Sequence, residues 1–177
     1  MFILRLRHGL ALLALISFDL TTTASAASLS GALGVTGQGD AVVRADTSFK
    51  WTSRWFESDR GSLTGYWDAA YTYWARGKHY RAAHSLSFSP VLVYEFNTRH
   101  SFTPYVEFGI GAALFSKTRV GEQKLGSAFN FEDRLAFGLA LPGQQRVGIR
   151  AIHYSNAGLN HPNKGIESYS LFYSRAF

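Results

Sequence analysis

The sequence contains no cysteine, and beyond residue 26 it has no long apolar run. The absence of cysteine excludes disulfide bonds and metal sites built from thiolates. A membrane-spanning helix needs about 20 consecutive apolar residues, so the apolar segments after residue 26 are too short to form one. Aromatic residues, in contrast, make up 15% of the chain. Because polar and apolar residues also alternate, this aromatic content favours β structure.

The first 26 residues have the composition of a secretory signal peptide. Positive charge from Arg5 and Arg7 precedes an apolar segment, Gly9 to Phe18, and Ala24-Ser25-Ala26 matches a small-x-small cleavage site. The apolar segment is about half the length that a membrane anchor requires. We therefore expect residues 1–26 to be a signal peptide and residues 27–177 to form a single exported domain.

Apolar and polar residues alternate with a period of two along most of the remaining chain. Between residues 42 and 56, for example, one face carries Val43 and Phe49 while the other carries Arg44 and Asp46. Successive side chains of a β-strand point to opposite faces, which gives this period. Eight such runs occur, at residues 28–37, 42–56, 62–75, 82–97, 101–116, 125–141, 144–155 and 165–177.

The length and the even number of these runs predict a membrane barrel. Strands that cross a bilayer at a tilt need about 9–11 residues, and most strands of soluble proteins are shorter. We therefore predict an all-β fold, an eight-stranded antiparallel transmembrane β-barrel in the bacterial outer membrane. Such barrels have short periplasmic turns and longer outer loops. We assign residues 57–60, 97–100 and 142–143 to turns, and residues 76–81, 117–124 and 156–164 to outer loops.

The face that would point into this barrel carries nearly balanced charge. An eight-stranded barrel is just filled by its side chains, and an unpaired buried charge is costly. We therefore expect ion pairs rather than an open pore. Asp133 does not fit, because strict alternation places it on the lipid-facing side, and we expect a β-bulge to correct its direction. The predicted lumen charges are Arg44, Lys50, Arg54, Arg134, Arg146, Arg150, Asp46, Asp68, Glu95, Glu107 and Glu132.

The last 25 or so residues combine an imidazole, a hydroxyl and a carboxylate, the three parts of a hydrolytic triad. His153 and Ser155 share one face of a strand, and Glu167 begins the next alternating run, the expected partner strand of a hairpin. By parity all three side chains face lipid, at the end expected to be extracellular. A carboxylate on a lipid-facing wall is costly and tends to be functional. For each residue alone, a solvated position at the rim is the alternative.

The segment His153-x-Ser155-Asn156-Ala157-Gly158-Leu159, followed by Asn163 and Gly165-Ile166-Glu167, resembles the PagL family, the lipid A 3-O-deacylases of the bacterial outer membrane. The resemblance implies hydrolysis of the ester at position 3 of lipid A, with no metal or other cofactor, by an active site on the outer wall of the barrel. It implies that Ser155 is the nucleophile, His153 the base and Glu167 the acid. Asn163 and the backbone N–H of Gly158 match the oxyanion donors.

A lipid A substrate would give a role to basic residues in the predicted outer loops. Lipid A carries two phosphates, which Arg and Lys are suited to bind, although ordinary solvated loop charges are the alternative. The expected partners are lipopolysaccharide and other outer-membrane lipids, with no nucleic acid, and a homo-oligomer stays open. The candidate phosphate-binding residues are Arg76, Lys78, Arg81, Lys117, Arg119 and Lys124.

Three other functions stay open at this point. An outer-membrane phospholipase also uses His and Ser on a barrel wall, but with an amide as the third member and with calcium. No carboxylate-rich calcium loop is visible in this sequence. An acyltransferase would pass the acyl group to an acceptor other than water. A non-catalytic small barrel would have larger loops and would be indifferent to Ser155→Ala.

Overall fold

The structure, a computed structural model, describes residues 27–77 and 80–177. The predicted signal peptide therefore lies outside the described residues. Within the described part, no helix is long and apolar enough to cross a membrane. The strands are β1 (Ala27–Thr36), β2 (Ala41–Lys50), β3 (Trp55–Ser58), β4 (Gly61–Trp74), β5 (Ala83–Phe96), β6 (Thr103–Phe115), β7 (Arg119–Val120), β8 (Gln123–Lys124), β9 (Phe129–Leu141), β10 (Gln145–Ser155) and β11 (Ile166–Ala176).

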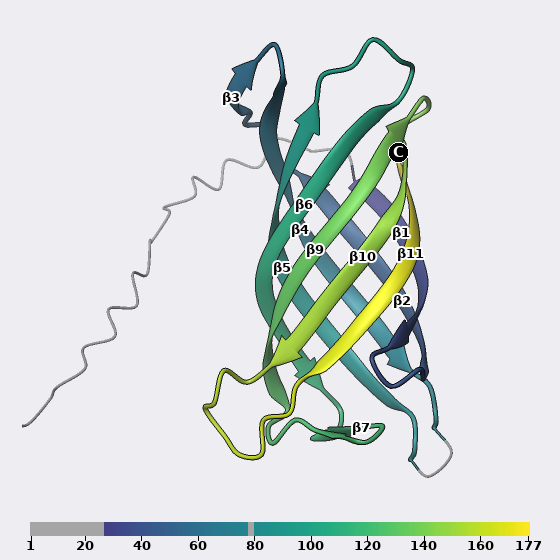
Figure 1. The fold of residues 1–177 in the computed structure, drawn as a ribbon, viewed down its shortest axis with the longest axis vertical. Helices are drawn as coiled ribbons and strands as arrows, with labels where there is room; N and C mark the ends of the chain where they lie inside the picture. Colours follow the sequence, from purple (N-terminus) through teal and green to yellow (C-terminus); the bar gives the residue numbers. More distant parts are fainter. Residues whose placement is uncertain (1–26, 78–79) are drawn as a thin grey trace, which may run out of the picture.

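Eight of these strands close into one antiparallel barrel (Figure 1). Their order is β2-β1-β11-β10-β9-β6-β5-β4, and pairing of β2 with β4 completes the circle. The first and last strands meet, with Thr36 opposite Ser168. The short strand β3 extends the sheet from β4, and β7 and β8 form a separate hairpin. The prediction of an all-β, eight-stranded antiparallel barrel is confirmed.

Two of the eight predicted strand ranges differ from the structure by more than two residues. The predicted run 42–56 stops at Lys50, because the Trp51 ring folds over Gly65, where a methyl group would overlap it. The predicted run 125–141 starts only at Phe129. The preceding residue Leu125 is fully buried in the loop, where its N–H donates to the Thr118 carbonyl at 2.9 Å.

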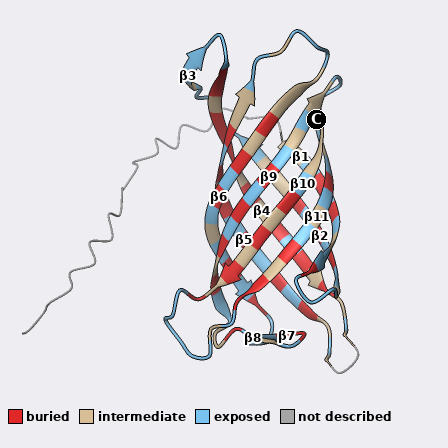
Figure 2. Ribbon diagram, in the orientation of Figure 1, coloured by how far each residue is buried: buried red, intermediate tan, exposed pale blue. Residues whose placement is uncertain are grey.

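The barrel is apolar on its outer wall and polar in its lumen. Figure 2 shows buried residues alternating with more exposed ones along most of the barrel strands, as the period of two predicts. Many large apolar side chains on the outside are exposed, and some are more than half exposed, among them Leu33 at 68%, Ile110 at 69% and Leu171 at 68%. A continuous apolar surface of this kind suits lipid rather than water.

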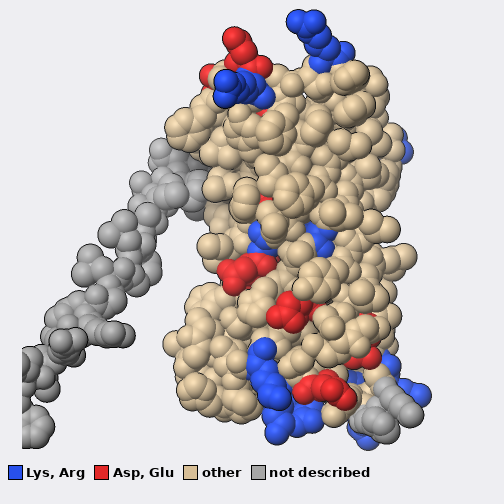
Figure 3. Space-filling view, in the orientation of Figure 1, with Lys and Arg blue, Asp and Glu red and all other residues tan. Residues whose placement is uncertain are grey.

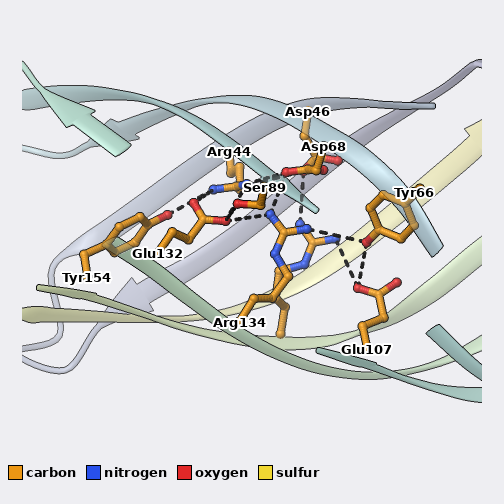
Figure 4. A network of polar contacts seen from close by, with 10 residues as sticks. Arg44, Asp46, Tyr66, Asp68, Ser89, Glu107, Glu132, Arg134 and Tyr154 are labelled. Atoms are coloured by element: carbon orange, nitrogen blue, oxygen red, sulfur yellow. Dashed lines mark hydrogen bonds and ion pairs between the residues drawn. The ribbon is translucent and has the colours of Figure 1, made fainter. Parts of the chain in front are cut away.

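The lumen holds a paired network of charged side chains (Figure 4). The Arg44 guanidinium lies 2.7 Å from Asp68 and 3.1 Å from Glu132, and Arg134 lies 2.6 Å and 2.8 Å from the same two carboxylates. Nearer the turns, Glu95 forms a second group with Lys50, Arg54 and Arg146, and Arg150 bridges Asp46 and Glu107. Every charge predicted to face the lumen therefore has an ion-pair partner, as expected.

An aromatic cluster closes the lumen next to these ion pairs, near the end that carries the longer loops, which we call the loop end. Trp74, Phe115 and Tyr154 pack edge-to-face or tilted, with ring centroids 5.3–5.5 Å apart. Arg44 Nη1 also donates to the Tyr154 hydroxyl at 3.0 Å. Since Tyr154 points inward, its two neighbours on β10 point outward and are held in place from inside the barrel.

The β-bulge predicted at Asp133 was wrong. Strand β9 keeps a continuous one-to-one register with both neighbours, and Asp133 lies opposite Ile110 of β6 and His153 of β10. The flanking residues Glu132 and Arg134 are fixed in the lumen by ion pairs. This fixed parity places the Asp133 side chain on the outer wall, where it is exposed.

Candidate active site

The outer wall at the loop end carries the three residues of the predicted triad. His153 and Ser155 lie near the end of β10, and Glu167 lies directly opposite His153 on β11. His153 Nδ1 and Glu167 Oε1 are 2.9 Å apart, a hydrogen-bond distance, and the side chains are 43% and 35% exposed. The hairpin β10–β11 thus brings an imidazole and a carboxylate together across fourteen positions of sequence.

Two glycines fix the position of this pair. Gly165 has φ +65°, and a Cβ there would lie 2.7 Å from Cε1 and 3.3 Å from Nε2 of His153, so a side chain would push the imidazole away. Behind the acid, the N–H of Gly37 donates to the Glu167 carbonyl at 3.2 Å. A Cβ at Gly37 would lie 3.2 Å from Glu167 Oε2. These close contacts restrain both the imidazole and the carboxylate.

Ser155 lies two residues beyond His153 on the same face of β10. Glu167 engages Nδ1, which leaves Nε2 as the ring nitrogen available to the serine. Among the hydrogen bonds of the described residues, the Ser155 hydroxyl has no partner, so it is free to take a new one. Hydrogen bonds between a nucleophile and its base often tighten only when substrate is bound.

Asp133 adds a second carboxylate beside the imidazole. In the register of the sheet His153 lies between Asp133 of β9 and Glu167 of β11. Asp133 is in none of the ion pairs that the described residues form, unlike every charge in the lumen. From the alternation alone, we expected a β-bulge to turn Asp133 away from the lipid-facing side. In the structure it stays on the outer wall, in the row of the site.

Asn156 organises the loop that follows Ser155. Its side chain is fully buried, and its Nδ2 donates to the carbonyls of Leu125 and Asn160 at 2.8 Å and 2.9 Å. Its backbone N–H donates to Asn163 Oδ1 at 3.1 Å. The loop of residues 156–165 is therefore tied both to itself and to the loop that carries β7 and β8. The type of residue 156 alone did not indicate this role.

A sequence model of the family described as lipid A 3-O-deacylase (PagL) matches residues 38–176. The chain belongs to this family. It is 55% identical over 164 residues to the lipid A deacylase PagL of Pseudomonas aeruginosa, covering 93% of this chain and 94% of the relative. It is 33% identical over 146 residues to the lipid A deacylase PagL of Bordetella bronchiseptica, covering 80% of each.

A solved structure described as the outer membrane enzyme PagL has the same fold. It superposes with a TM-score of 0.82 and 55% sequence identity, covering 85% of this chain and 99% of the solved chain. The expected family and the outer-membrane barrel are therefore confirmed. The roles of individual residues stay predictions, because a family match does not test them.

The two oxyanion donors expected from the PagL resemblance differ in their surroundings. Asn163 uses Oδ1 to accept the N–H of Asn156, which leaves its Nδ2 group available as a donor. The N–H of Gly158 instead donates to Asn156 Oδ1 at 2.9 Å. Gly158 could therefore stabilise an oxyanion only after this bond opens, whereas Asn163 needs no such change.

Some of the basic residues that were predicted to bind phosphate lie together in the structure. Arg81, Lys117 and Arg119 line one cleft at the loop end, with the Arg119 guanidinium 5.5 Å from the Tyr80 ring centroid. Lys124 lies opposite Arg119 in the β7–β8 hairpin. Figure 3 shows Lys and Arg gathered at this lower end of the view. Arg76 is exposed in the loop after β4 and does not line the cleft, and Lys78 lies outside the described residues.

The described residues contain no group of three or more His, Asp, Glu or Cys side chains arranged to hold a metal ion.

Proposed function

We propose that this chain hydrolyses the 3-O-linked acyl ester of lipid A with Ser155 as nucleophile, His153 as base and Glu167 as acid, on the lipid-facing wall near the extracellular end of the barrel. Membership of the PagL family supports the reaction and the substrate. The observation that carries the residue assignment is the 2.9 Å contact between His153 and Glu167 on the outer wall, beside a serine with an unengaged hydroxyl.

In this mechanism Ser155 Oγ attacks the ester carbonyl while His153 Nε2 takes the hydroxyl proton. Glu167 accepts a hydrogen bond from Nδ1–H, which fixes the tautomer and stabilises the imidazolium. The imidazolium returns the proton to the leaving sugar oxygen, and water then hydrolyses the acyl-serine. Asn163 Nδ2 is the oxyanion donor that needs no hydrogen bond to open first, and each donor to an oxyanion contributes about 3 kcal/mol.

The outer-wall position suits a membrane lipid. A soluble substrate would have to enter the hydrocarbon region to reach Ser155, whereas the acyl chains of lipid A already lie there. The longer loops sit at the same end as the triad, which supports the extracellular side, since outer loops are the longer ones in these barrels. The cleft lined by Arg81, Lys117 and Arg119 supports binding of the lipid A phosphates at that level.

Mass spectrometry of lipid A from cells that produce the protein tests the proposal. Wild type is expected to remove one 3-hydroxyacyl chain, and Ser155→Ala is expected to leave lipid A intact. Ser101→Ala is the matched control, because Ser101 is an exposed serine at the opposite end of the barrel. Deacylation by Ser155→Ala at the rate of wild type would refute the nucleophile. Release of fatty acid from glycerophospholipid, with lipid A unchanged, would indicate a phospholipase instead.

A further inference from the structure

Three rows of outward-facing side chains descend from the site along β9, β10 and β11. The cross-strand register places successive rows two residues apart along each strand, because alternate residues point outward. The upper row contains both carboxylates and the imidazole, and the two rows below it are apolar apart from the Tyr169 hydroxyl. The rows are Asp133–His153–Glu167, Leu135–Ala151–Tyr169 and Phe137–Ile149–Leu171.

Ala151 is the one small side chain in the middle and lower rows. Its neighbours Leu135 and Tyr169 are large and stand 37% and 51% exposed on either side of it. A short side chain between two long ones leaves a hollow in the wall. The spacing along a strand places this hollow about 7 Å below His153, since alternate residues are separated by two steps of about 3.4 Å.

Two hollows of the outer wall meet at this position. One, of about 400 Å³, is lined by His153, Glu167 and Asp133 at its upper edge and by apolar residues below. The other, of about 490 Å³, continues over the lower row to Leu33 and Val35 of β1. Both are lined by the middle row, Leu135, Ala151 and Tyr169. A continuous apolar path therefore begins at the imidazole and passes over Ala151.

We infer that this path, which we call the Ala151 groove, holds the acyl chain of the ester under attack, and that Ala151 determines which chains fit. The inference rests on the proposed triad and goes beyond it by assigning chain selection to one residue. The occupant is an acyl chain, because the outward-facing side chains below the upper edge are apolar apart from the Tyr169 hydroxyl, and the ester carbonyl would lie at that edge. Any apolar wall of a barrel contacts lipid, but this hollow also includes the imidazole and the carboxylate that would act on the ester.

Filling the groove at its floor should therefore change selectivity. Phenylalanine at position 151 would occupy the space between Leu135 and Tyr169 and force a long chain away from the wall. A short acyl group ends before this row and should be affected less. A few methylenes gained or lost in an apolar site change rates by roughly 10-fold or more, so the ratio of long-chain to short-chain rates should fall about tenfold.

The test compares hydrolysis of p-nitrophenyl laurate and p-nitrophenyl butyrate in detergent by purified proteins. Ala151→Phe is expected to lower the laurate-to-butyrate rate ratio about tenfold, and Ala151→Val to lower it less. Ala69→Phe is the matched control, because Ala69 also lies on the outer wall, opposite Phe88 of β5, at the far side of the barrel from β10. Its ratio should equal that of wild type.

The outcomes separate the groove from the triad. An unchanged ratio in both Ala151 variants, with Ser155→Ala inactive on both esters, overturns the groove alone. Equal hydrolysis by wild type and Ser155→Ala overturns the proposed triad, and the groove with it. The valine variant keeps the test decisive if the phenylalanine variant does not fold, because it adds only two methyl groups to the wall.

Discussion

Two consecutive residues of β9, Glu132 and Asp133, show that a carboxylate has very different surroundings on the two faces of this barrel. Glu132 is 0% exposed and is paired with both Arg44 and Arg134. Asp133 points to the outer wall and is in none of the ion pairs of the described residues. Strand β10 repeats the contrast, with Arg150 and Tyr154 engaged in the lumen and His153 and Ser155 outside.

The difference distinguishes polar groups that stabilise the fold from polar groups that are free to interact with a substrate. Inside, each charge has a partner at a fixed distance, so its removal leaves a buried charge uncompensated. Outside, Ser155 and Asp133 keep unengaged oxygen atoms next to an imidazole. Polar groups that the fold does not satisfy, on a surface where they are costly, are available to a substrate. The predictions below test this division, from the largest expected effect to the smallest.

Ser155→Ala and His153→Ala are each expected to lower lipid A deacylation more than about a thousandfold, because each removes a member of one catalytic unit. Neither residue packs in the lumen, so the barrel should fold as before. Initial rates on purified lipid A measure the loss, and the heat-modifiable shift on gels measures folding. A variant that keeps near wild-type rates would remove that residue from the mechanism.

Glu132→Ala should act on stability instead. Breaking a buried ion pair by removing one partner costs about 3–5 kcal/mol, and here Arg44 and Arg134 both lose a carboxylate. The expected value is at the lower end, since Asp68 still contacts both guanidinium groups. Urea-induced unfolding in lipid vesicles gives the free energy. Asp133→Ala is the control on the same strand, and a loss of equal size there would contradict the division.

Glu167→Ala is expected to be less damaging than His153→Ala. Its rate should stay about 10- to 100-fold above that of His153→Ala, because the acid orients the base but does not transfer the proton. Residues that act as a unit are not additive. The double variant should therefore be no slower than His153→Ala alone. A full additional loss in the double variant would show that Glu167 acts outside the unit.

Neutralising the basic loop residues should have a smaller effect that depends on salt. The triple variants are Arg76, Lys78 and Arg81 to Gln, or Lys117, Arg119 and Lys124 to Gln. Each is expected to slow hydrolysis of bis-phosphorylated lipid A about tenfold or less at low salt, since exposed pairs contribute little individually. Physiological salt shortens charge interactions to about 8 Å and should reduce the difference.

An uncharged ester is the control for these variants, because it lacks the phosphates. Its hydrolysis rate should barely change. Because Arg81, Lys117 and Arg119 share one cleft, a third variant that combines these residues should have the strongest effect. Wild-type rates on lipid A at low salt in all three variants would show that contacts along the wall, rather than the loops, position the substrate.

Asp133→Asn should have the smallest effect. It removes one negative charge from the strand position opposite the imidazolium that the proposed mechanism forms, and between exposed charges this is worth about 1 kcal/mol or less, at most roughly fivefold in rate. Stability should not fall, since Asp133 has no ion pair to lose. Rates on lipid A and unfolding by urea, measured on the same preparation, check both parts. Destabilisation without a change in rate would make Asp133 a structural residue like Glu132.

The sequence predicted the barrel well because every strand follows one simple rule. Alternation assigned each lumen charge to the correct face, and six strand ranges agree with the structure within two residues. The rule failed where contacts between distant segments decide the conformation. Trp51 folds over Gly65, and Leu125 is held by Thr118 and Asn156, so neither segment continues as a strand.

The sequence predicted which residues form the candidate site, but it did not predict the residues that surround and support them. The spacing of His153, Ser155 and Glu167 and the parity of their strands placed all three on one face of adjacent strands, as the structure has them. Their catalytic roles stay predictions. Gly165, Gly37 and Asn156 support the site through close packing and loop hydrogen bonds, which period-two patterns do not encode. The shared cleft of Arg81 and Arg119 likewise depends on how two loops fold together.

The pairing of β1 with β11 means that the proposed site is completed only when the barrel closes. Glu167 is backed by Gly37, and the lower part of the Ala151 groove includes Leu33 and Val35, all of which belong to the first strand and the loop after it. These groups reach the last strand only when the two ends of the chain pair. A chain whose two ends have not paired therefore lacks part of the proposed site, and we expect esterase activity only after the barrel has closed.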